Sequence, residues 1–203
     1  MIKRKIAVFI LSLTMVIGGT TAAFADTNSW NSVTIYPQDV MNTEYLTPVK
    51  FLMDKKVVTG DDDGKFHPEK SITRAEFATM MAKATNNVND LDNIKKKNTF
   101  TDLAGYDWAK GYINACAKAN LINGVGNDKF APGKEVTYAE VITVIIRSKN
   151  PTAVNYGTWP ENYIQYAQMN MNSMIGDRNI TDWSAPADKG DVAMMLYRSM
   201  PKN

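Results

Sequence analysis

Apolar residues recur along the chain at the spacing of one helix face, in short stretches separated by polar loops. A stripe of this kind is typical of a helix that buries one side in a core. One stripe consists of Trp108, Tyr112, Ile113 and Cys116. Further stripes of aliphatic and Met residues consist of Met80, Met81, Val141, Ile142, Val144, Ile145, Ile146, Met194, Met195 and Leu196. The pattern predicts an all-α fold whose core is built from these side chains.

A second pattern, of particular residue types at fixed spacing, occurs more than once and indicates a repeat architecture. In the first copy it consists of Asp39, Tyr45, Gly60, Phe66, Pro68 and Thr73, and in the second of Asp102, Trp108, Gly124, Phe130, Pro132 and Thr137. A weaker third copy begins at Trp159 and has no recognisable Phe-x-Pro segment between Gly176 and Asp188. We assign the repeats to residues 33–95, 96–150 and 151–203, with a polar linker at 86–99.

Each copy is predicted to fold as helix, loop and helix. The second helix opens with Thr73-x-x-Glu76 and with Thr137-x-x-Glu140, which are capping boxes, and Asp188-x-x-Asp191 is an acidic variant of the same pattern. One repeat cannot bury its apolar stripes alone. We therefore expect the three copies to pack around a pseudo-threefold axis, with equivalent grooves between neighbours.

The N-terminus carries an export signal. Lys3, Arg4 and Lys5 precede an apolar run that is too short for a membrane span, and Ala23-Phe24-Ala25 supplies a cleavage pattern, so residues 1–25 are predicted to be a signal peptide. Cleavage removes three of the 23 Lys and Arg residues and none of the 21 Asp and Glu residues, which leaves a net charge of −1. A mature chain with this charge is not expected to bind nucleic acid.

The side chains that support catalysis or metal binding are sparse. Cys116 is the single cysteine, so an internal disulfide is impossible, and its alanine-rich surroundings favour a buried, inert thiol. His67 is the single histidine and has no partner at metal-ligand spacing. Glu76 and Glu140 are explained as members of capping boxes. The sequence therefore predicts no enzyme activity, no metal and no cofactor.

The acidic run Asp61-Asp62-Asp63-Gly64 suggests a calcium loop at first sight. An EF-hand loop with Gly64 at its sixth position would place Thr59 at the first position and Lys70 at the twelfth. Neither residue can supply the anchoring carboxylate that such a loop needs. A solvated loop before Phe66 is the better interpretation.

These motifs resemble the S-layer homology repeat from about residue 33 onward. The resemblance is carried by Thr73-Arg74-Ala75-Glu76, by the Gly-to-Phe-x-Pro segment in two copies and by Trp-x-x-x-Tyr-Ile in two copies. It implies a three-repeat helical domain, secreted to the cell wall or cell surface. There it would bind non-covalently a secondary polysaccharide attached to peptidoglycan, often one ending in a pyruvate ketal. The second and third copies depart from the pattern at Tyr138 and at Lys189-Gly190.

Three residues occupy the same position, one residue inside the second helix of each copy: Arg74, Tyr138 and Lys189. Free N–H groups and the helix dipole favour an anion at such a position, and a cation there is understandable if an anion joins it. We expect Arg74 to contribute most to binding. Its replacement by Ala is expected to weaken binding about ten- to a hundred-fold with little loss of fold, because Thr73 and Glu76 retain the cap.

The remaining candidate ligand residues are Trp108, Trp159, Tyr45, Gly60, Gly124, Asp39 and Asp102. The three aromatic residues suit a flat face for a sugar ring and equally suit the core of the first helix. The two glycines suit a turn, and the resemblance implies that their loops also let backbone N–H groups approach a ligand. The two aspartates precede the first helix and favour a capping role over ligand contact.

Two other functions stay open at this stage. The repeats fill the mature chain, so the protein could be a structural or adaptor protein that bridges to other envelope proteins. A wall-active hydrolase is the less favoured alternative, because proteins with such repeats often carry hydrolases.

Overall fold

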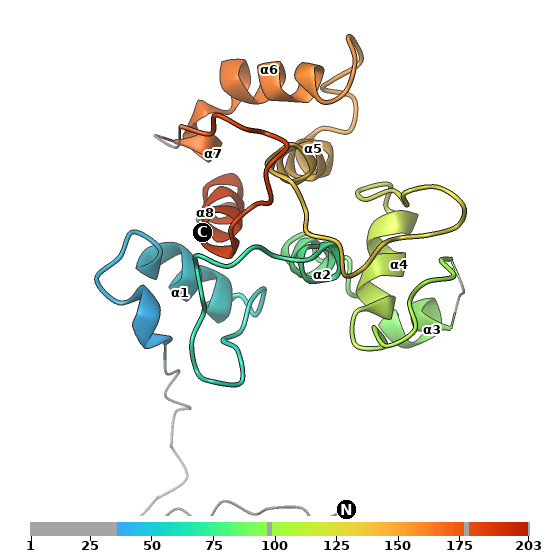
Figure 1. Cartoon of the computed structure of the whole chain (residues 1–203), viewed down its shortest axis with the longest axis horizontal. Helices are drawn as coiled ribbons and strands as arrows, with labels where there is room; N and C mark the ends of the chain where they lie inside the picture. The colour runs from blue at the N-terminus through green and yellow to red at the C-terminus, as the bar shows by residue number, and fades with distance from the viewer. Residues whose placement is uncertain (1–35, 97–98, 177–178, 203) are drawn as a thin grey trace, which may run out of the picture. The chain divides into compact units, whose positions relative to one another are not determined.

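The computed structural model describes residues 36–96, 99–176 and 179–202, so the predicted signal peptide lies outside the described residues. The elements in chain order are η1 (Gln38–Val40), α1 (Leu46–Asp54), α2 (Arg74–Ala84), α3 (Leu91–Lys95), α4 (Lys110–Lys118), α5 (Tyr138–Lys149), α6 (Glu161–Asn170), α7 (Asn172–Ile175) and α8 (Lys189–Ser199) (Figure 1). The described residues contain isolated β-bridges and no strand. The all-α prediction is confirmed.

Helices of different copies pack on each other. The first helix of each predicted copy packs on the second helix of another copy: α4 on α2, α6 on α5 and α1 on α8 (Figure 1). The first and second helices of one copy are therefore not each other's main packing partners, although the short helix α7 packs on both α6 and α8 within the third copy. This arrangement agrees with the expectation that a single repeat cannot bury its own core.

The segments before α2, α5 and α8 join in a closed ring of backbone hydrogen bonds. The Ile72 N–H donates to the Ala187 carbonyl (3.2 Å), the Ala187 N–H to the Val136 carbonyl (2.8 Å), and the Val136 N–H to the Ile72 carbonyl (3.0 Å). All three side chains are buried. The ring ties the three predicted copies together at the point where their second helices begin, whereas rotational symmetry of the whole stays a prediction.

The three predicted starts of the second helices are confirmed, and two of them carry the predicted capping box. Thr73 and Glu76 form a capping box at α2, and Thr137 and Glu140 form one at α5. The acidic variant at α8 is wrong, because Asp188 makes no side-chain capping hydrogen bond there. The Asp191 carboxylate instead accepts hydrogen bonds from the hydroxyls of Tyr45 and Tyr138, which belong to the other two copies.

The predicted apolar stripes form the core, except that Trp108 precedes α4 and is 53% exposed. The large side chains that are almost fully buried include Phe66, Phe77, Phe130, Ile142, Ile145 and Met195. Cys116 is buried as well, and its thiol donates to the Ala78 carbonyl (3.2 Å). Burial raises the pKa of the Cys116 thiol to about 12. The predicted burial of the thiol is confirmed, and a thiol with so high a pKa is expected to be inert.

The predicted linker contains the short helix α3, which packs on α4. The Asn114 amide on α4 donates to the Ile94 carbonyl (3.1 Å) and fixes this contact. Among the described helices, none combines the length and the apolar character that a membrane crossing requires.

Candidate functional site

Three grooves run beside α5, α2 and α8, and each is lined by residues from more than one predicted copy. The α5 groove, of about 280 Å³, is lined by Arg74, Leu121, Ile122, Asn123, Gly124, Val125, Glu140, Thr143, Val144, Arg147 and Trp159. The α2 groove, of about 210 Å³, is lined by Val57, Val58, Thr59, Asp61, Ile72, Glu76, Thr79, Met80, Lys83, Trp108 and Lys189. The α8 groove, of about 310 Å³, is lined by Tyr138, Asn179, Ile180, Thr181, Asp182, Ala185 and Asp191.

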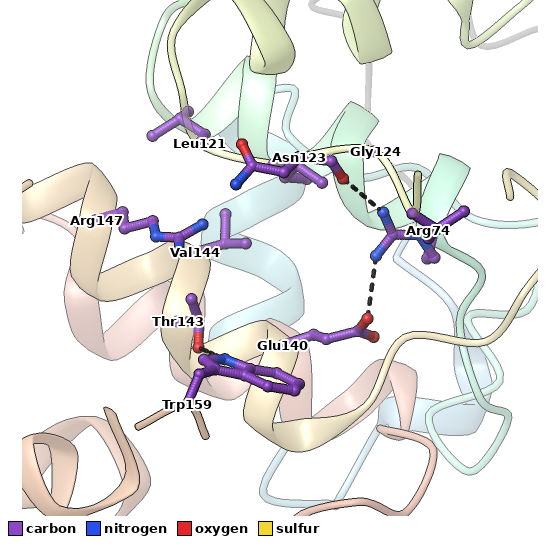
Figure 2. A pocket seen from close by; sticks show the side chains of 11 residues that line it. Arg74, Leu121, Asn123, Gly124, Glu140, Thr143, Val144, Arg147 and Trp159 are labelled. Carbon is purple, nitrogen blue, oxygen red and sulfur yellow. Dashed lines mark hydrogen bonds and ion pairs between the residues drawn. The ribbon is translucent and has the colours of Figure 1, made fainter. Parts of the chain in front are cut away.

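Arg74 forms one end of the α5 groove and is only 5% exposed. Its guanidinium donates to the carbonyls of Phe130 (3.0 Å) and Asn123 (2.9 Å) and pairs with the Glu140 carboxylate (3.1 Å), as Figure 2 shows in part. Burial lowers the pKa of the Arg74 guanidinium from its usual value, and the charges of Glu140 and Asp102 oppose that shift. Arg74 therefore fastens the loop at residues 121–125 to the start of α5.

Trp159 lies on the other side of the α5 groove. Its indole N–H donates to the Thr143 hydroxyl (3.0 Å), yet 53% of the residue stays exposed (Figure 2). The hydrogen bond fixes the orientation of the ring while a large part of the ring faces solvent. The core reading is therefore wrong for Trp159, and its role as a face for a sugar ring stays a prediction.

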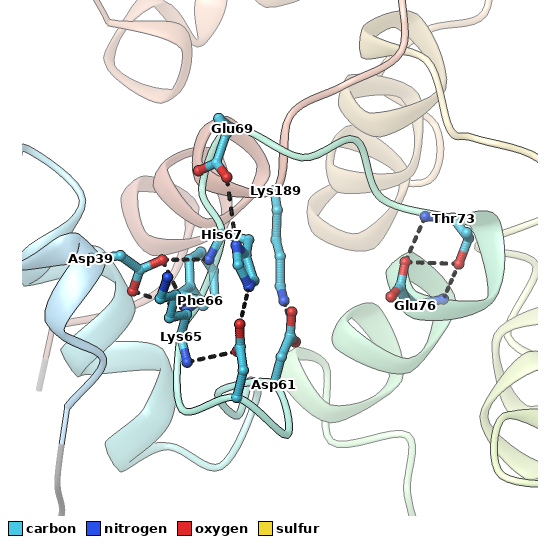
Figure 3. Close-up of polar contacts among 10 residues, drawn as sticks. Asp39, Asp61, Lys65, Phe66, His67, Glu69, Thr73, Glu76 and Lys189 are labelled. Atoms are coloured by element: carbon cyan, nitrogen blue, oxygen red, sulfur yellow. Dashed lines mark hydrogen bonds and ion pairs between the residues drawn. The ribbon is translucent and has the colours of Figure 1, made fainter.

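The α2 groove repeats this arrangement with different charges. Trp108 is also 53% exposed, and Lys189 pairs with Asp61 across the groove mouth (2.8 Å; Figure 3). The Lys189 ammonium lies 4.8 Å from the centre of the Phe66 ring. Lys189 thus takes the place of Arg74, although a single ammonium replaces the planar guanidinium.

The α8 groove differs in its polar groups. The hydroxyls of Tyr45 (3.1 Å) and Tyr138 (2.7 Å) donate to the Asp191 carboxylate, and Asp191 is 6% exposed. Burial, and then the hydrogen bond to Asp191, raise the pKa of Tyr138. The described residues that line this groove include no Lys or Arg. Its wall is therefore acidic where the walls of the other two grooves carry cations.

Tyr45 does not offer an exposed ring as the two tryptophans do. The residue is partly buried against the core, and a Cβ added at Gly190 would lie 2.7 Å from its ring. Gly190 is therefore required by the close approach of Tyr45. For this aromatic residue, the core reading is the correct one.

The N–H groups at the starts of the second helices are already paired, so the prediction that they are free for an anion is wrong. At α2, the N–H groups of Arg74 and Ala75 donate to the carbonyls of Lys134 and Pro132. At α5, those of Tyr138 and Ala139 donate to the carbonyls of Ala185 and Trp183. At α8, those of Lys189 and Gly190 donate to the carbonyls of Lys70 and Pro68, and all six distances are 2.8–3.2 Å. Each carbonyl comes from the segment before another second helix. These partners lie far away in the sequence, so local patterns could not reveal them.

The sequence suggested that Asp39 and Asp102 cap the first helices, and this is wrong. The Asp39 carboxylate accepts from the N–H groups of Phe66 (3.0 Å) and His67 (2.7 Å; Figure 3), and Asp102 accepts from Phe130 (2.9 Å) and Ala131 (2.8 Å). Burial acts to raise the pKa of both carboxyls, but these N–H donors outweigh it and the pKa values are lowered. Both aspartates hold the Phe-x-Pro loops beside the grooves.

The two candidate glycines allow close approach of neighbouring groups. A Cβ at Gly124 would lie 2.6 Å from the Lys129 carbonyl oxygen and 2.7 Å from the Phe100 ring, and one at Gly60 would lie 3.3 Å from the Lys65 carbonyl oxygen. Gly124 lines the α5 groove directly. A side chain at residue 124 would displace the loop that Arg74 holds.

Arg147 and Lys83 also line the grooves, and the sequence reading missed them. Each lies seven residues after the glutamate of a capping box, Glu140 or Glu76. Seven residues make about two helical turns, so each cation lies on the same helix face as its glutamate. This spacing was the signal that could have identified them.

The described part of the chain contains no cluster of three His, Cys, Asp or Glu side chains suited to an ion. In the acidic loop, Asp61 pairs with Lys189, and Asp63 lies 2.8 Å from the His67 ring nitrogen. These contacts make the loop part of the wall of the α2 groove.

Comparisons with known proteins bear on this architecture. The family model described as the S-layer homology domain matches residues 39–78 and 99–142. The chain is 31% identical over 161 residues, 79% of its length, to the middle cell wall protein of Brevibacillus brevis. It is 31% identical over 138 residues, 68% of its length, to the surface layer protein of Brevibacillus choshinensis. It is 31% identical over 124 residues, 58% of its length, to the cellulosome-anchoring protein of Acetivibrio thermocellus. The matched parts make up 15%, 12% and 28% of these relatives.

Proposed function

The chain is an S-layer homology domain protein, and we propose on this basis that it attaches non-covalently to a polysaccharide linked to the bacterial cell wall. It is a protein of the cell wall or cell surface, in keeping with relatives named as a cell wall protein and a surface layer protein. The polymer end that it binds carries an anionic group such as a pyruvate ketal. Binding is reversible and involves no chemical change of the polymer.

The observation that carries this proposal is the pairing of an exposed indole with cations in one groove. Trp159 and Arg147 line the α5 groove, and Trp108 and Lys83 line the α2 groove. Sugar rings have apolar faces that pack on aromatic rings, and a guanidinium or ammonium attracts a carboxylate. An anionic saccharide matches both features at once.

The proposal also ranks the three grooves. Beside its exposed tryptophan, the α5 groove carries the Arg147 guanidinium and the α2 groove the Lys83 ammonium, while the described lining of the α8 groove carries the Asp191 and Asp182 carboxylates. An anionic polymer end gains no attraction from a groove whose described lining holds carboxylates and no Lys or Arg, and an arginine holds a carboxylate better than a lysine. We expect affinity to fall in the order α5, α2 and α8 groove.

Residues 151–203 form a third repeat under this proposal, after repeats at 33–95 and 96–150, around a pseudo-threefold axis. The ring of hydrogen bonds at Ile72, Val136 and Ala187 and the packing of α6 on α5 support it. The third repeat completes the grooves, because Trp159 and Lys189 both come from it.

We also propose that the chain has no enzyme activity. The glutamates that line the α5 and α2 grooves, Glu140 and Glu76, each accept a backbone N–H in a capping box, and Glu140 also pairs with Arg74. A general acid must hold its carboxyl beside the scissile bond, whereas both of these carboxylates are bound to the backbone at the start of their own helix. Release of soluble sugar from purified walls would contradict this part.

Sedimentation with cell-wall sacculi tests the binding itself. Residues 26–203 should pellet with sacculi that carry their secondary polymer and stay in solution with sacculi from which acid has removed it. Undiminished binding to stripped sacculi would show that the proposed ligand is wrong. Failure to bind either preparation would contradict wall attachment altogether.

A further inference from the structure

A cation recurs at one helical position in all three predicted copies. Arg147, Lys83 and Arg198 each lie seven residues after the acidic residue at the start of their helix. Arg147 lines the α5 groove and Lys83 lines the α2 groove. Their side chains therefore reach the same part of equivalent grooves, beside the exposed tryptophans.

The cations at the helix starts are engaged within the protein. Arg74 makes hydrogen bonds to two carbonyls and an ion pair with Glu140, and Lys189 pairs with Asp61. A ligand carboxylate at Arg74 would have to compete with Glu140, which is held in place by its capping box. Such a cation supports the groove wall and is poorly placed to add much attraction for an anion.

Arg147 is engaged differently. Its Nε donates to the Tyr163 hydroxyl (3.2 Å), and its guanidinium lies 5.4 Å from the centre of the Tyr163 ring. Figure 2 shows the guanidinium beside Val144, on the side of the opening away from Arg74 and Glu140. The contact through Nε orients the planar group, whose two terminal amino groups are not used in this contact and make a fork that matches a carboxylate.

We propose that Arg147 in the α5 groove and Lys83 in the α2 groove contact the anionic group of the wall polymer, and that Arg74 and Lys189 are positioning residues for the groove walls. This inference rests on the proposed function and assigns the charge recognition within it. The Lys83 ammonium lies 5.5 Å from the centre of the Tyr112 ring, as Arg147 lies over Tyr163. In both grooves, therefore, the cation that we assign to the ligand lies over a tyrosine ring of the protein.

The third cation of the series is turned into the protein. Arg198 donates to the Ile175 carbonyl (3.0 Å), and a Cβ added at Gly176 would collide with its guanidinium. Arg198 is not among the residues that line the α8 groove. The equivalent position in this copy stabilises the end of α7 and does not recognise the ligand.

The test uses the chain from residue 26 onward, with polymer-carrying sacculi, stripped sacculi and polymer-carrying sacculi whose carboxyl groups have been amidated. The variants are Arg147→Gln, Lys83→Gln, the double variant and the conservative Arg147→Lys. Lys149→Gln is the matched control, because Lys149 is an exposed cation on the same helix and lines neither groove. Arg74→Gln is compared as the positioning variant. Dissociation constants are measured between low and high salt, and melting temperatures report the fold.

Arg147→Gln should weaken binding about ten- to a hundred-fold, as expected for loss of a charge-assisted contact, and should reduce its dependence on salt. Lys83→Gln should have a smaller effect in the same direction, Arg147→Lys should recover part of the affinity, and Lys149→Gln should bind like the wild type. On amidated sacculi, the wild type and Arg147→Gln should bind equally weakly. Arg74→Gln should lower the melting temperature and leave the salt dependence at its wild-type value.

Wild-type affinity and salt dependence in the double variant would overturn the inference, and the proposed function would stand if the wild type still required the polymer. A weaker double variant with unchanged salt dependence would also overturn it, because the lost contact would then not involve charge. A wild-type chain that ignores the polymer would refute the proposed function, and this inference with it.

Discussion

Replacing Arg74 with Ala removes a guanidinium that is 5% exposed and that joins three parts of the fold. The variant leaves the carbonyls of Phe130 and Asn123 without this donor, and it leaves the Glu140 carboxylate, whose side chain is 19% exposed, without its ion pair. Breaking one partner of a buried pair typically costs about 3–5 kcal/mol. We therefore expect Arg74→Ala to lower the free energy of unfolding by about 3 kcal/mol or more, which corrects the expectation from the sequence that the fold would be little affected.

The equivalent position in the third copy supplies the comparison. Lys189 pairs with Asp61, whose side chain is 45% exposed, so the ion pair is screened by solvent. Exposed pairs of this kind typically contribute about 0–1 kcal/mol. Lys189→Ala should therefore destabilise the protein far less than Arg74→Ala, although both residues occupy the first position of a second helix.

Urea unfolding followed by circular dichroism measures both variants against the wild type. The comparison requires a single cooperative transition and similar dependence on urea for all three proteins. A loss below about 1 kcal/mol for Arg74→Ala, or equal losses for the two variants, would refute the reasoning that burial of the guanidinium decides its contribution.

Three further predictions concern polar groups that are buried or half-buried. Tyr138→Phe should lower the free energy of unfolding by about 1–3 kcal/mol in urea titrations, because the buried Asp191 carboxylate loses a hydroxyl donor; no change would show that this hydrogen bond is replaced. Cys116 should resist thiol reagents at pH 8 until the chain unfolds, since its pKa is raised to about 12, and rapid labelling of the folded protein would contradict its burial. Asp39 and Asp102 have lowered pKa values in the folded state, so their contribution is complete above the unfolded pKa of about 4 and is lost as the pH falls toward the folded values. Replacing both with Asn should flatten the loss of stability below pH 4 in acid titrations, and an unchanged acid profile would exclude them as its source.

Features that depend on neighbours in the sequence could be predicted, and those that depend on distant partners could not. The capping boxes at Thr73 and Thr137 act over three residues, and the apolar stripes act over one or two helical turns, so both are visible in the sequence. Arg74 meets Glu140 across 66 residues, and Tyr45 meets Asp191 across 146. Such pairings follow from the exchange of helices between copies, which no local pattern specifies.

In the candidate site, too, local sequence identified the residues, but their roles depend on distant partners. Trp108 and Trp159 were identified from their recurrence, but their exposure had to come from the packing of the helices around them. Asp39 and Asp102 were placed correctly beside the first helices and given the wrong role, since the loops that they hold lie 27–29 residues further along the chain. A carboxylate can cap a helix or hold a distant loop equally well, and only the fold decides between them.

Titration of the soluble secondary wall polymer into the chain, followed by tryptophan fluorescence and calorimetry, tests the central claim most directly. The account predicts that the wild type binds, that Trp159→Ala and Trp108→Ala each weaken binding about tenfold or more, and that the double variant has almost no affinity while its helical spectrum is retained. Wild-type affinity in a folded double variant would contradict the claim that the α5 and α2 grooves bind the polymer.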